Sequence, residues 1–273
     1  MKKVYQKLAN LKDILADVHS ALIAYSGGVD STFLLKIAQD VLEDRVVAVT
    51  ASSETYPSYE LEAAKDMAKG LGVRHIVVHT RELANRDFAN NSPDRCYFCK
   101  RELFSKLKNI AKQYNLKFVL DGSNYDDLND HRPGMRAAQE FEVRSPLQEA
   151  MLTKADIRLL SKEMNLPTWD KPSFACLATR IPYGDKITRE KLKAIDQAEN
   201  FLHSLGIKQV RVRHHGTVAR IEVFKDDMPL LLREDLTNKI IEKFRNLGYT
   251  YVTLDLRGYR TGSMNEILKK KNG

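Results

Sequence analysis

A short glycine turn between a buried strand and a helix constrains this chain more than any other feature. Residues 21–25 form an apolar run that predicts a buried strand, and residues 32–42 repeat apolar side chains near the helical period. Between them lies the turn Ser26-Gly27-Gly28-Val29-Asp30-Ser31. Adjacent glycines let the backbone bend and approach a ligand without Cβ clashes, and the amides that open the helix face an incoming anion. The sequence therefore predicts a phosphate cradle here.

This turn differs from two common phosphate loops. No Gly-Lys-Ser/Thr follows it, which excludes a Walker loop, and its two glycines are adjacent with no third, which excludes the dinucleotide fingerprint. An ordinary strand–helix turn is the alternative interpretation. The strand–SGGVDS–helix unit resembles the PP-loop of the ATP pyrophosphatases, which include NAD synthetases, GMP synthetases and tRNA thiolases. The resemblance implies cleavage of ATP between its α- and β-phosphates, with Asp30 helping to hold Mg²⁺. The implied ATP-binding residues are Ala24, Ser26, Gly27, Gly28, Asp30, Ser31, Ser52 and Gly122.

Composition places the chain among globular proteins. Its 273 residues are 43% hydrophobic and 29% charged, which suits one large domain or two medium ones. No apolar run approaches the length of a membrane span, and residues 1–15 look like an amphipathic helix rather than a signal peptide, so we expect a cytoplasmic protein with no membrane partner. Most of the net charge of +8 lies in residues 186–273, which carry 18 basic against 11 acidic residues. That segment could meet RNA or a phosphorylated small molecule.

Alternating strands and helices predict an α/β fold. Apolar strands are expected at residues 46–51, 75–80 and 118–120, and helices at about 58–71, 96–115 and 153–164. Strands and helices at this spacing form a parallel sheet with helices on both faces, and ligands then sit at the carboxyl ends of the strands. Residues 124–148 and 167–184 are expected to be irregular. We expect a PP-loop domain at residues 1–184 and a smaller α+β domain for substrate binding or oligomerisation at 185–273.

The smaller domain is predicted to be an α-β-β-α-β unit. A helix capped by Thr188 is followed by a hairpin of residues 208–214 and 217–224, which turns at His215-Gly216 and sets Arg213 opposite Val218. Arg211 then lies opposite Arg220. A helix at about 236–247 and a strand at 251–256 complete the unit. Strand alternation places four charged side chains on one face: Arg211, Arg213, Arg220 and Glu222.

The three cysteines argue for metal or redox chemistry, since their number is odd. Cys96 and Cys99 form a Cys-x-x-Cys pair at the expected start of a helix, where the helix dipole favours thiolates. Cys176 lies in the second irregular segment. Zinc would need a fourth ligand such as His131, and a dithiol redox pair would leave Cys176 unused. Three thiolates suit an iron–sulfur cluster with one open iron, while structural or incidental thiols are the remaining alternative.

Six motifs together resemble one family over essentially the whole chain. They are SGGVDS, PDRCYFC, DGSNYDD followed by NDHRPG, CLATRIPYG, VRVRHH with ARIE, and YVTLDLRGYRTGSMN. The family is LarE, the ATP-dependent sulfurtransferases that act on pyridinium-3,5-biscarboxylic acid mononucleotide to build the nickel-pincer nucleotide of lactate racemase. The resemblance implies that a substrate carboxylate attacks the α-phosphate of ATP and that sulfur then displaces AMP. A homo-oligomer, such as a hexamer, is also implied.

The resemblance further assigns residue roles. In one branch of the family only the position of Cys176 is a cysteine, and it gives up its own sulfur. This chain has all three cysteines, so it resembles the branch in which Cys96, Cys99 and Cys176 hold a [4Fe-4S] cluster that carries sulfide from an outside donor. Cys176 and Asp30 are the implied catalytic residues. The implied substrate-binding residues are Arg180, Arg211, Arg213, Glu222 and Arg260.

Other interpretations remain open for several of these residues. Arginines on a polar strand face are commonly only solvated. The acidic residues Asp126, Asp127 and Asp130 could bind Mg²⁺ or substrate, or could form a solvated loop. A tRNA thiolase would carry an RNA-binding module, and the aromatic residues do not interleave with the basic ones as such a module requires. A nucleotide sensor or an iron–sulfur scaffold would not need the chemistry around Asp30.

Overall fold

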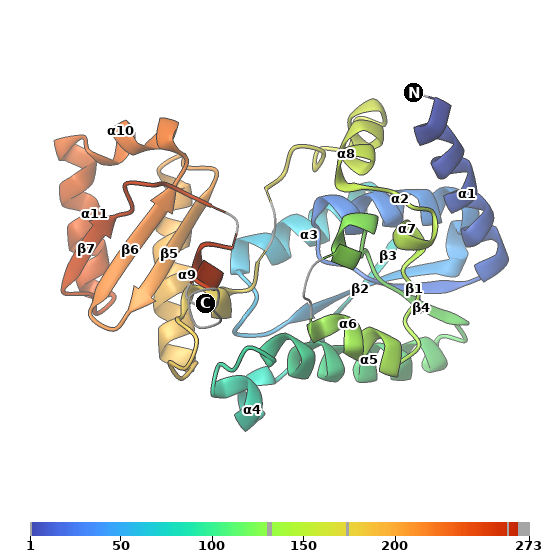
Figure 1. Ribbon diagram of the computed structural model, residues 1–273, viewed down its shortest axis with the longest axis horizontal. Helices are drawn as coiled ribbons and strands as arrows, with labels where there is room; N and C mark the ends of the chain where they lie inside the picture. Colours follow the sequence, from blue (N-terminus) through green and yellow to red (C-terminus); the bar gives the residue numbers. More distant parts are fainter. Residues whose placement is uncertain (1, 130–132, 173–174, 261, 267–273) are drawn as a thin grey trace. The chain divides into compact units, whose positions relative to one another are not determined.

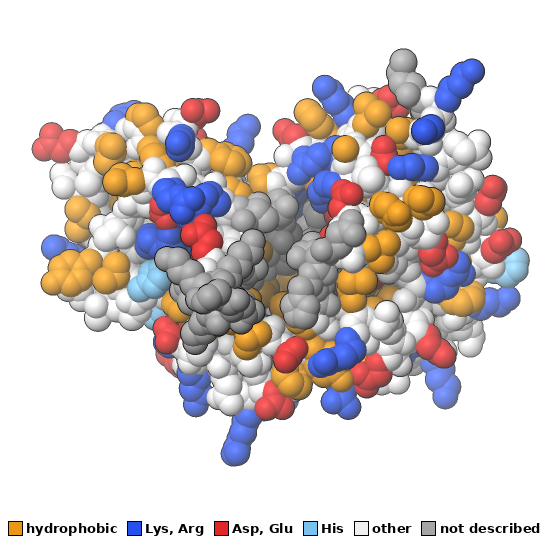
Figure 2. Space-filling view, viewed as in Figure 1, with side chains coloured by type: hydrophobic (Ala, Val, Ile, Leu, Met, Phe, Trp, Pro, Cys, Tyr) orange, Lys and Arg blue, Asp and Glu red, His pale blue; other side chains and the backbone are white. Residues whose placement is uncertain are grey.

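The computed structural model describes residues 2–129, 133–172, 175–260 and 262–266. The chain divides into two compact units, each with its own core. The first unit comprises Met1–Phe88 and Pro93–Phe174, and the second comprises Ala89–Ser92 and Ala175–Gly273. None of the helices in the described part of the chain combines the length and apolar character that a bilayer crossing demands. On the face shown in Figure 2, acidic and basic side chains are interspersed over both units.

The first unit is built on a four-stranded parallel sheet (Figure 1). Its strands are β1 (Ala21–Ala24), β2 (Val46–Ser52), β3 (Arg74–His79) and β4 (Phe118–Leu120), in the order β3-β2-β1-β4. Alternate residues of β1 face different cores, because Ile23 packs in one apolar cluster and Leu22 in another. A strand buried on both faces needs an unbroken apolar run, which is the pattern seen in residues 21–24.

Helices cover both faces of this sheet, as predicted, so the α/β fold class is confirmed (Figure 1). One face is covered by α5 (Arg95–Gln113) and α6 (Pro133–Glu140). The other face is covered by α1 (Lys2–Val18), α2 (Val29–Leu42), α3 (Ser58–Gly70), α7 (Pro146–Glu149) and α8 (Lys154–Glu163). The short α4 (Arg86–Ala89) lies between β3 and α5.

The strand order creates a switch point beside β1. The chain runs from β1 to β2 and β3 on one side of the sheet, then returns to place β4 on the other side of β1. In open parallel sheets, the crevice outside the carboxyl ends of the strands at such a point is the preferred ligand site. The SGGVDS turn follows β1 and the DGSN segment follows β4, so this crevice is where both motifs lie.

The segment 124–148 is more ordered than the sequence predicts. It contains a short 3-10 helix (Tyr125–Asn129), α6 and α7. Proline at the first position of α6 and of α7 fixes a helical φ without losing a needed amide, and Ala137 of α6 is fully buried against α5. The expectation of an irregular segment was therefore wrong for α6. Asp130 and His131 lie outside the described residues.

The second unit is an α-β-β-α-β arrangement, as predicted. Strands β5 (Val210–His215), β6 (Val218–Val223) and β7 (Tyr251–Leu254) form a sheet in that order, with β5–β6 antiparallel and β6–β7 parallel. The core between the sheet and the helices contains Val212, Ile221 and Phe244. The Thr188 side chain caps the first helix by accepting the Lys191 amide at 3.3 Å, as predicted. The helices are α9 (Arg189–Ser204), α10 (Met228–Leu231) and α11 (Glu234–Asn246).

The predicted hairpin register is wrong by two residues. The structure pairs Arg213 with Arg220 and Arg211 with Glu222. The two-residue turn is Gly216-Thr217, in which Gly216 takes a φ of 62° at the first central position. A two-residue hairpin turn favours glycine there because that position requires positive φ. A shift of two residues preserves the alternation, so the four charged side chains still share one face.

The segment that carries Cys176 belongs to the second unit, so the predicted boundary at 184/185 falls inside that unit. Asn91 ties this segment to residues 89–92. Its side-chain amide, which is fully buried, donates to the carbonyls of Ile181, Pro182 and Asp185 at 3.2, 2.7 and 3.1 Å. The Ile187 amide also donates to the Ala89 carbonyl at 2.8 Å.

Candidate active site

A cavity of about 370 Å³ opens at the carboxyl ends of β1 and β4, within the first unit. Its lining combines loop backbone, serines, carboxylates and two lysines. The side chains and backbone that line it belong to Ala24, Ser26, Gly28, Val29, Asp30, Ser31, Lys100, Asp121, Gly122, Ser123, Asn124, Asp126, Asp127, Lys154 and Pro172. It is therefore a polar cavity at the switch point of the sheet.

Two glycines allow the close packing of the SGGVDS turn. Gly27 has a φ of 65°, and a Cβ on it would lie 2.8 Å from the Cβ of Ala64 in α3. A Cβ on Gly122, which follows β4, would lie 3.0 Å from the amide nitrogen of Ser31. The space beside that amide is a place where an anion could approach, since it lies in the first turn of α2. The hydroxyls of Ser26 and Ser31 are hydrogen-bonded to each other at 3.0 Å.

Two side chains fix the first peptide groups of the turn. The Tyr56 hydroxyl donates to the Ser26 carbonyl at 2.8 Å, and the Lys171 ammonium donates to the Gly27 carbonyl at 3.1 Å. Lys171 also pairs with Glu60 of α3 at 2.5 Å. Burial raises the pKa of Tyr56, and the nearby Glu60 carboxylate adds to the rise, so the phenol keeps its proton at neutral pH. Neither Tyr56 nor Lys171 was predicted from the sequence.

Asp30 carries one satisfied and one unsatisfied oxygen. Its Oδ2 accepts from the Lys154 ammonium at 2.7 Å and from the Asn124 side-chain amide at 3.3 Å. Its Oδ1 is buried and has no hydrogen-bond partner within the described ranges. Mg²⁺ prefers carboxylate and phosphate oxygens and commonly takes only one or two protein ligands. The unsatisfied oxygen therefore fits a Mg²⁺ ligand.

Among the described residues, no group of three or more His, Cys, Asp and Glu side chains is placed to hold a metal ion. A magnesium ion at Asp30 would draw its other ligands from nucleotide phosphates and water, which is usual for this ion.

The other carboxylates of the cavity organise its walls. Asp126 accepts from the Lys154 backbone amide at 2.8 Å, and Asp127 accepts from the Asn124 amide at 3.0 Å. Asp121 accepts from the hydroxyls of Ser123 and Ser145 at 2.8 and 2.7 Å. These bonds give Asp126 and Asp127 a structural role in the wall of the cavity.

The predicted ATP-binding residues do not all reach the cavity. Ala24, Ser26, Gly28, Asp30, Ser31 and Gly122 line it. Gly27 and Ser52 are not among its lining residues. Gly27 instead packs against Ala64 of α3. Ser52 is the last residue of β2, and its carbonyl accepts from the Thr80 amide at 3.1 Å.

The three cysteines are divided between the two units. Cys96 and Cys99 lie near the start of α5 in the first unit, as predicted, and their spacing of three residues places them on one helix face. The Cys99 thiol lies 3.9 Å from an oxygen of the buried Glu82. Cys176 immediately precedes the 3-10 helix Leu177–Arg180 in the second unit. In the part of the chain that the structure describes, none of the three forms a disulfide.

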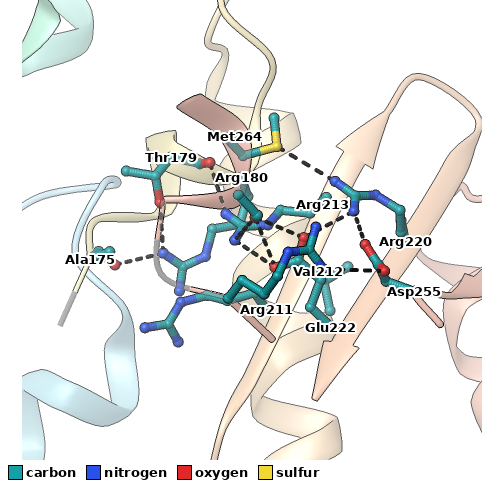
Figure 3. A network of polar contacts seen from close by, with 12 residues as sticks. Ala175, Thr179, Arg180, Arg211, Val212, Arg213, Arg220, Glu222, Asp255 and Met264 are labelled. Carbon is teal, nitrogen blue, oxygen red and sulfur yellow. Dashed lines mark hydrogen bonds and ion pairs between the residues drawn. The ribbon is translucent and has the colours of Figure 1, made fainter. Parts of the chain in front are cut away.

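The charged face of β5 and β6 forms a buried polar network (Figure 3). Arg213 donates to Glu222 at 2.7 Å and to the Ser263 hydroxyl at 3.0 Å, and it reaches the Thr179 carbonyl at 3.1 Å. Its Nε is buried and finds no partner in the part of the chain that the structure describes. Glu222 also pairs with Arg220 at 3.0 Å, and Arg220 pairs in turn with Asp255.

Arg180 is enclosed in protein rather than presented at a surface. Its side chain is 0% exposed and forms a two-pronged pair with Glu199 at 2.9 and 2.8 Å. The same guanidinium donates to the carbonyls of Ala175 and Cys176 at 2.7 and 3.0 Å. Burial acts to raise the pKa of Glu199, but the charge and hydrogen bonds of Arg180 outweigh it and hold that pKa below its usual range. Arg180 thus fixes the backbone around Cys176.

Two further arginines lie beside this network. Arg211 donates to the Val210 carbonyl at 2.8 Å, and its guanidinium lies 5.6 Å from the centre of the Tyr259 ring. Figure 3 shows the Arg211 side chain turned away from Glu222. Arg260 donates to the Gly258 carbonyl at 3.1 Å and to Glu266 at 3.3 Å. The structure therefore brings Arg213 and Glu222 together and leaves Arg211 and Arg260 at the edge of the cluster.

Comparison with known proteins agrees with this architecture. Residues 16–119, which span β1 to β4, match the asparagine synthase family model. The chain is 24% identical over 210 residues to a subunit of the glutamine-hydrolysing GMP synthase of Sulfurisphaera tokodaii, covering 69% of this chain and 56% of that protein. It is 44% identical over 264 residues to an uncharacterized protein of Synechocystis sp., covering 97% and 98% of the two chains.

One relative carries a specific name and matches from end to end. The pyridinium-3,5-bisthiocarboxylic acid mononucleotide synthase of Lactiplantibacillus plantarum is 39% identical over 272 residues, covering 99% of this chain and 98% of that protein. The match includes both units, and a polar cavity at the switch point of the sheet fits an enzyme that consumes ATP. The chain therefore belongs to the LarE family of ATP-dependent sulfurtransferases.

Proposed function

We propose that this enzyme uses ATP to convert a carboxylate of pyridinium-3,5-biscarboxylic acid mononucleotide into a thiocarboxylate. The observation that carries the proposal is the polar cavity at the β1/β4 switch point. It is lined by the SGGVDS turn, in which Oδ1 of Asp30 is buried without a hydrogen-bond partner among the described residues. The end-to-end similarity to a pyridinium-3,5-bisthiocarboxylic acid mononucleotide synthase supports the choice of substrate.

The chemistry takes place in two balanced steps. A carboxylate oxygen of the substrate attacks the α-phosphorus of ATP, the bond to the β-phosphate breaks, and pyrophosphate leaves with that electron pair. Hydrosulfide then attacks the carbonyl carbon of the acyl-adenylate, the bond to the AMP oxygen breaks, and AMP and a proton are released. The first step turns an inert carboxylate into an acyl group with a good leaving group.

Residues of the first unit supply the groups for the first step. The amides at the start of α2 and the hydroxyls of Ser26 and Ser31 would receive phosphate oxygens. Asp30 would hold Mg²⁺, which neutralises charge as pyrophosphate departs. Tyr56 and Lys171 hold the turn in this shape through the carbonyls of Ser26 and Gly27.

Three cysteines would hold the sulfur carrier. Cys96, Cys99 and Cys176 are the proposed ligands of a [4Fe-4S] cluster, which when bound would present sulfide for the second step. The placement of Cys96 and Cys99 on one helix face, near a helix start that favours thiolates, supports two of the three ligands. Arg180 would orient the third by holding the Cys176 carbonyl.

The arginine network of the second unit is the proposed site for the substrate phosphate. Arg213 supports this role because its buried Nε has no partner among the described residues, and Glu222 keeps its guanidinium oriented. Arg211 and Arg260 would add charge from the edge of the cluster. Arg180 has its donors engaged by Glu199 and by backbone, so its geometry supports positioning Cys176 better than binding phosphate.

The first experiment tests the nucleotide site. Anaerobically reconstituted enzyme is incubated with ATP, Mg²⁺, sulfide and the biscarboxylic mononucleotide, and AMP, pyrophosphate and thiocarboxylate are measured. We expect Asp30→Asn to abolish all three products. Asp40→Asn is the matched control, because Asp40 lies on the same helix and pairs with Lys36 at 2.6 Å. Thiocarboxylate formation by Asp30→Asn at the wild-type rate would contradict the proposal.

A second experiment tests the sulfur carrier. Iron and acid-labile sulfide are counted in the wild type and in Cys96→Ala and Cys99→Ala, together with the mass of the protein after turnover. We expect a cluster in the wild type and its loss in both variants. A colourless, active wild type that loses the Cys176 sulfur would instead show a sacrificial donor. Light scattering of the same preparation tests the predicted homo-oligomer.

A further inference from the structure

Lys154 reaches into the cavity from the first position of α8. Its backbone is held by Asp126, and the Thr153 capping box starts the helix at this residue. Its ammonium extends to Oδ2 of Asp30, 2.7 Å away, and its side chain remains 31% exposed. Lys154 is thus fixed at its base and free to change partner at its tip, because lysine carries its charge on a flexible four-carbon stem.

The pairing with Asp30 conflicts with a loaded site. Lys154 already neutralises the carboxylate whose other oxygen fits Mg²⁺. A divalent ion on Asp30 would repel an ammonium held at the same carboxylate. The cavity also contains the carboxylates of Asp121, Asp126 and Asp127, which disfavour a polyanion unless cations compensate for them.

We propose that Lys154 exchanges partners when the nucleotide enters. In the free enzyme it is the counter-ion of Asp30, and when Mg·ATP binds, Mg²⁺ replaces it there and its ammonium moves to the β- or γ-phosphate. The inference rests on the proposed function, since it assumes that ATP occupies this cavity. Lys154 thereby becomes a phosphate-binding residue that stays with the pyrophosphate as that group leaves.

This exchange predicts effects of opposite sign for two ligands. Without Lys154, a divalent ion meets an uncompensated Asp30, so binding of the ion alone becomes stronger. Binding of Mg·ATP becomes weaker, because the lost charge-assisted hydrogen bond to a phosphate outweighs the contact with Asp30 that Lys154 gives up in the exchange. AMP lacks the β- and γ-phosphates, so its affinity stays unchanged.

The test compares Lys154→Met with the wild type. Mn²⁺ is the metal probe, and its affinity in the absence of nucleotide is measured by electron paramagnetic resonance. The affinities for Mg·AMPCPP, a non-hydrolysable ATP analogue, and for AMP are measured by calorimetry. We expect Mn²⁺ to bind about tenfold tighter, because the Lys154–Asp30 contact no longer competes with it. We expect Mg·AMPCPP to bind about tenfold weaker, because the lost contact with the phosphate outweighs that gain by about one charge-assisted hydrogen bond. Lys154→Arg should recover most of the analogue affinity because it keeps the charge.

Lys7→Met is the matched control. Lys7 pairs with Asp156 of the same helix at the same distance, 2.7 Å, and it does not line the cavity. We expect this variant to leave all three affinities unchanged. Equal weakening of Mn²⁺, AMPCPP and AMP in Lys154→Met would show a purely structural lysine and overturn the inference. A wild type that fails to bind Mg·AMPCPP would overturn the proposed function itself.

Discussion

The contact between Gly27 and Ala64 leads to a quantitative prediction. Gly27→Ala forces an L-residue into a φ of 65°, and left-handed backbone costs about 1–2 kcal/mol for such a residue. The new Cβ would also lie 2.8 Å from the Cβ and 3.1 Å from the Cα of Ala64. Overpacking of this kind typically costs about 1–3 kcal/mol. The expected loss in the free energy of unfolding is therefore about 2–5 kcal/mol.

A double-mutant cycle separates the two contributions. Ala64→Gly removes the Cβ that the new methyl group would meet, at its own cost of about 1 kcal/mol for glycine inside a helix. The Cα of residue 64 still lies close, so the double variant recovers only part of the overlap. We expect a coupling of about 1–2 kcal/mol, such that the double variant is more stable than the sum of the single changes predicts.

The assay is urea unfolding followed by the fluorescence of Trp169. Trp169 is the one tryptophan of the chain and belongs to the same unit as Gly27, so its fluorescence reports on the unfolding of that unit. Gly70→Ala is the control, because a Cβ on that glycine, also in α3, meets nothing within 4 Å. A coupling energy of zero would refute the reasoning, since it would mean that contact with Ala64 is not what excludes a side chain at position 27.

Further predictions concern the amide of Ser31 and the buried pair of the second unit. Gly122→Ala should lower ATP affinity about tenfold, as expected for losing one charge-assisted hydrogen bond, since its Cβ would lie 3.0 Å from the Ser31 nitrogen; unchanged calorimetric affinity would contradict this. Arg180→Met leaves the buried Glu199 carboxylate without its ion-pair partner, so chemical denaturation should show a free energy of unfolding lower by about 3–5 kcal/mol. The double variant Arg180→Met/Glu199→Leu should recover most of that loss. A double variant no more stable than the single one would count against this account. Because the folded-state pKa of Glu199 is depressed, its stabilisation is complete above the unfolded pKa and is lost as the pH falls towards the folded value. The wild type should therefore lose stability more steeply than the double variant below about pH 4, and equal slopes would contradict the prediction.

The first unit could largely be predicted because its signals are local. Apolar runs, a glycine turn and helical periodicity lie within windows of about 15 residues, and parallel strands joined by helices have few allowed arrangements. The strands β1 and β2 and the helices α2 and α3 match the expected ranges to within about three residues at each end. The cavity followed from the same logic, because the carboxyl ends of adjacent parallel strands meet at one edge.

The remaining features depend on contacts between distant residues. Tyr56 and Lys171 hold the turn from 30 and 144 positions away along the chain, and no local pattern marks them. Arg180 pairs with Glu199, which lies 19 positions away on another element, and no local pattern marks this pair. The hairpin register depended on which residue of the turn takes positive φ, and the sequence allowed Gly216 at either central position.

Asn91 has a consequence for dissecting the protein into pieces. The segment Ala89–Ser92 is the one part of the first half of the chain that belongs to the second unit. Within it, the side-chain amide of Asn91 donates to three carbonyls of that unit. A fragment beginning at Ala175 would leave those acceptors without their donor, and each unsatisfied buried group costs about 1–3 kcal/mol. Excising the C-terminal piece alone should thus yield a poorly folded product. A short peptide spanning residues 89–92, supplied in trans or fused ahead of Ala175, is the natural remedy.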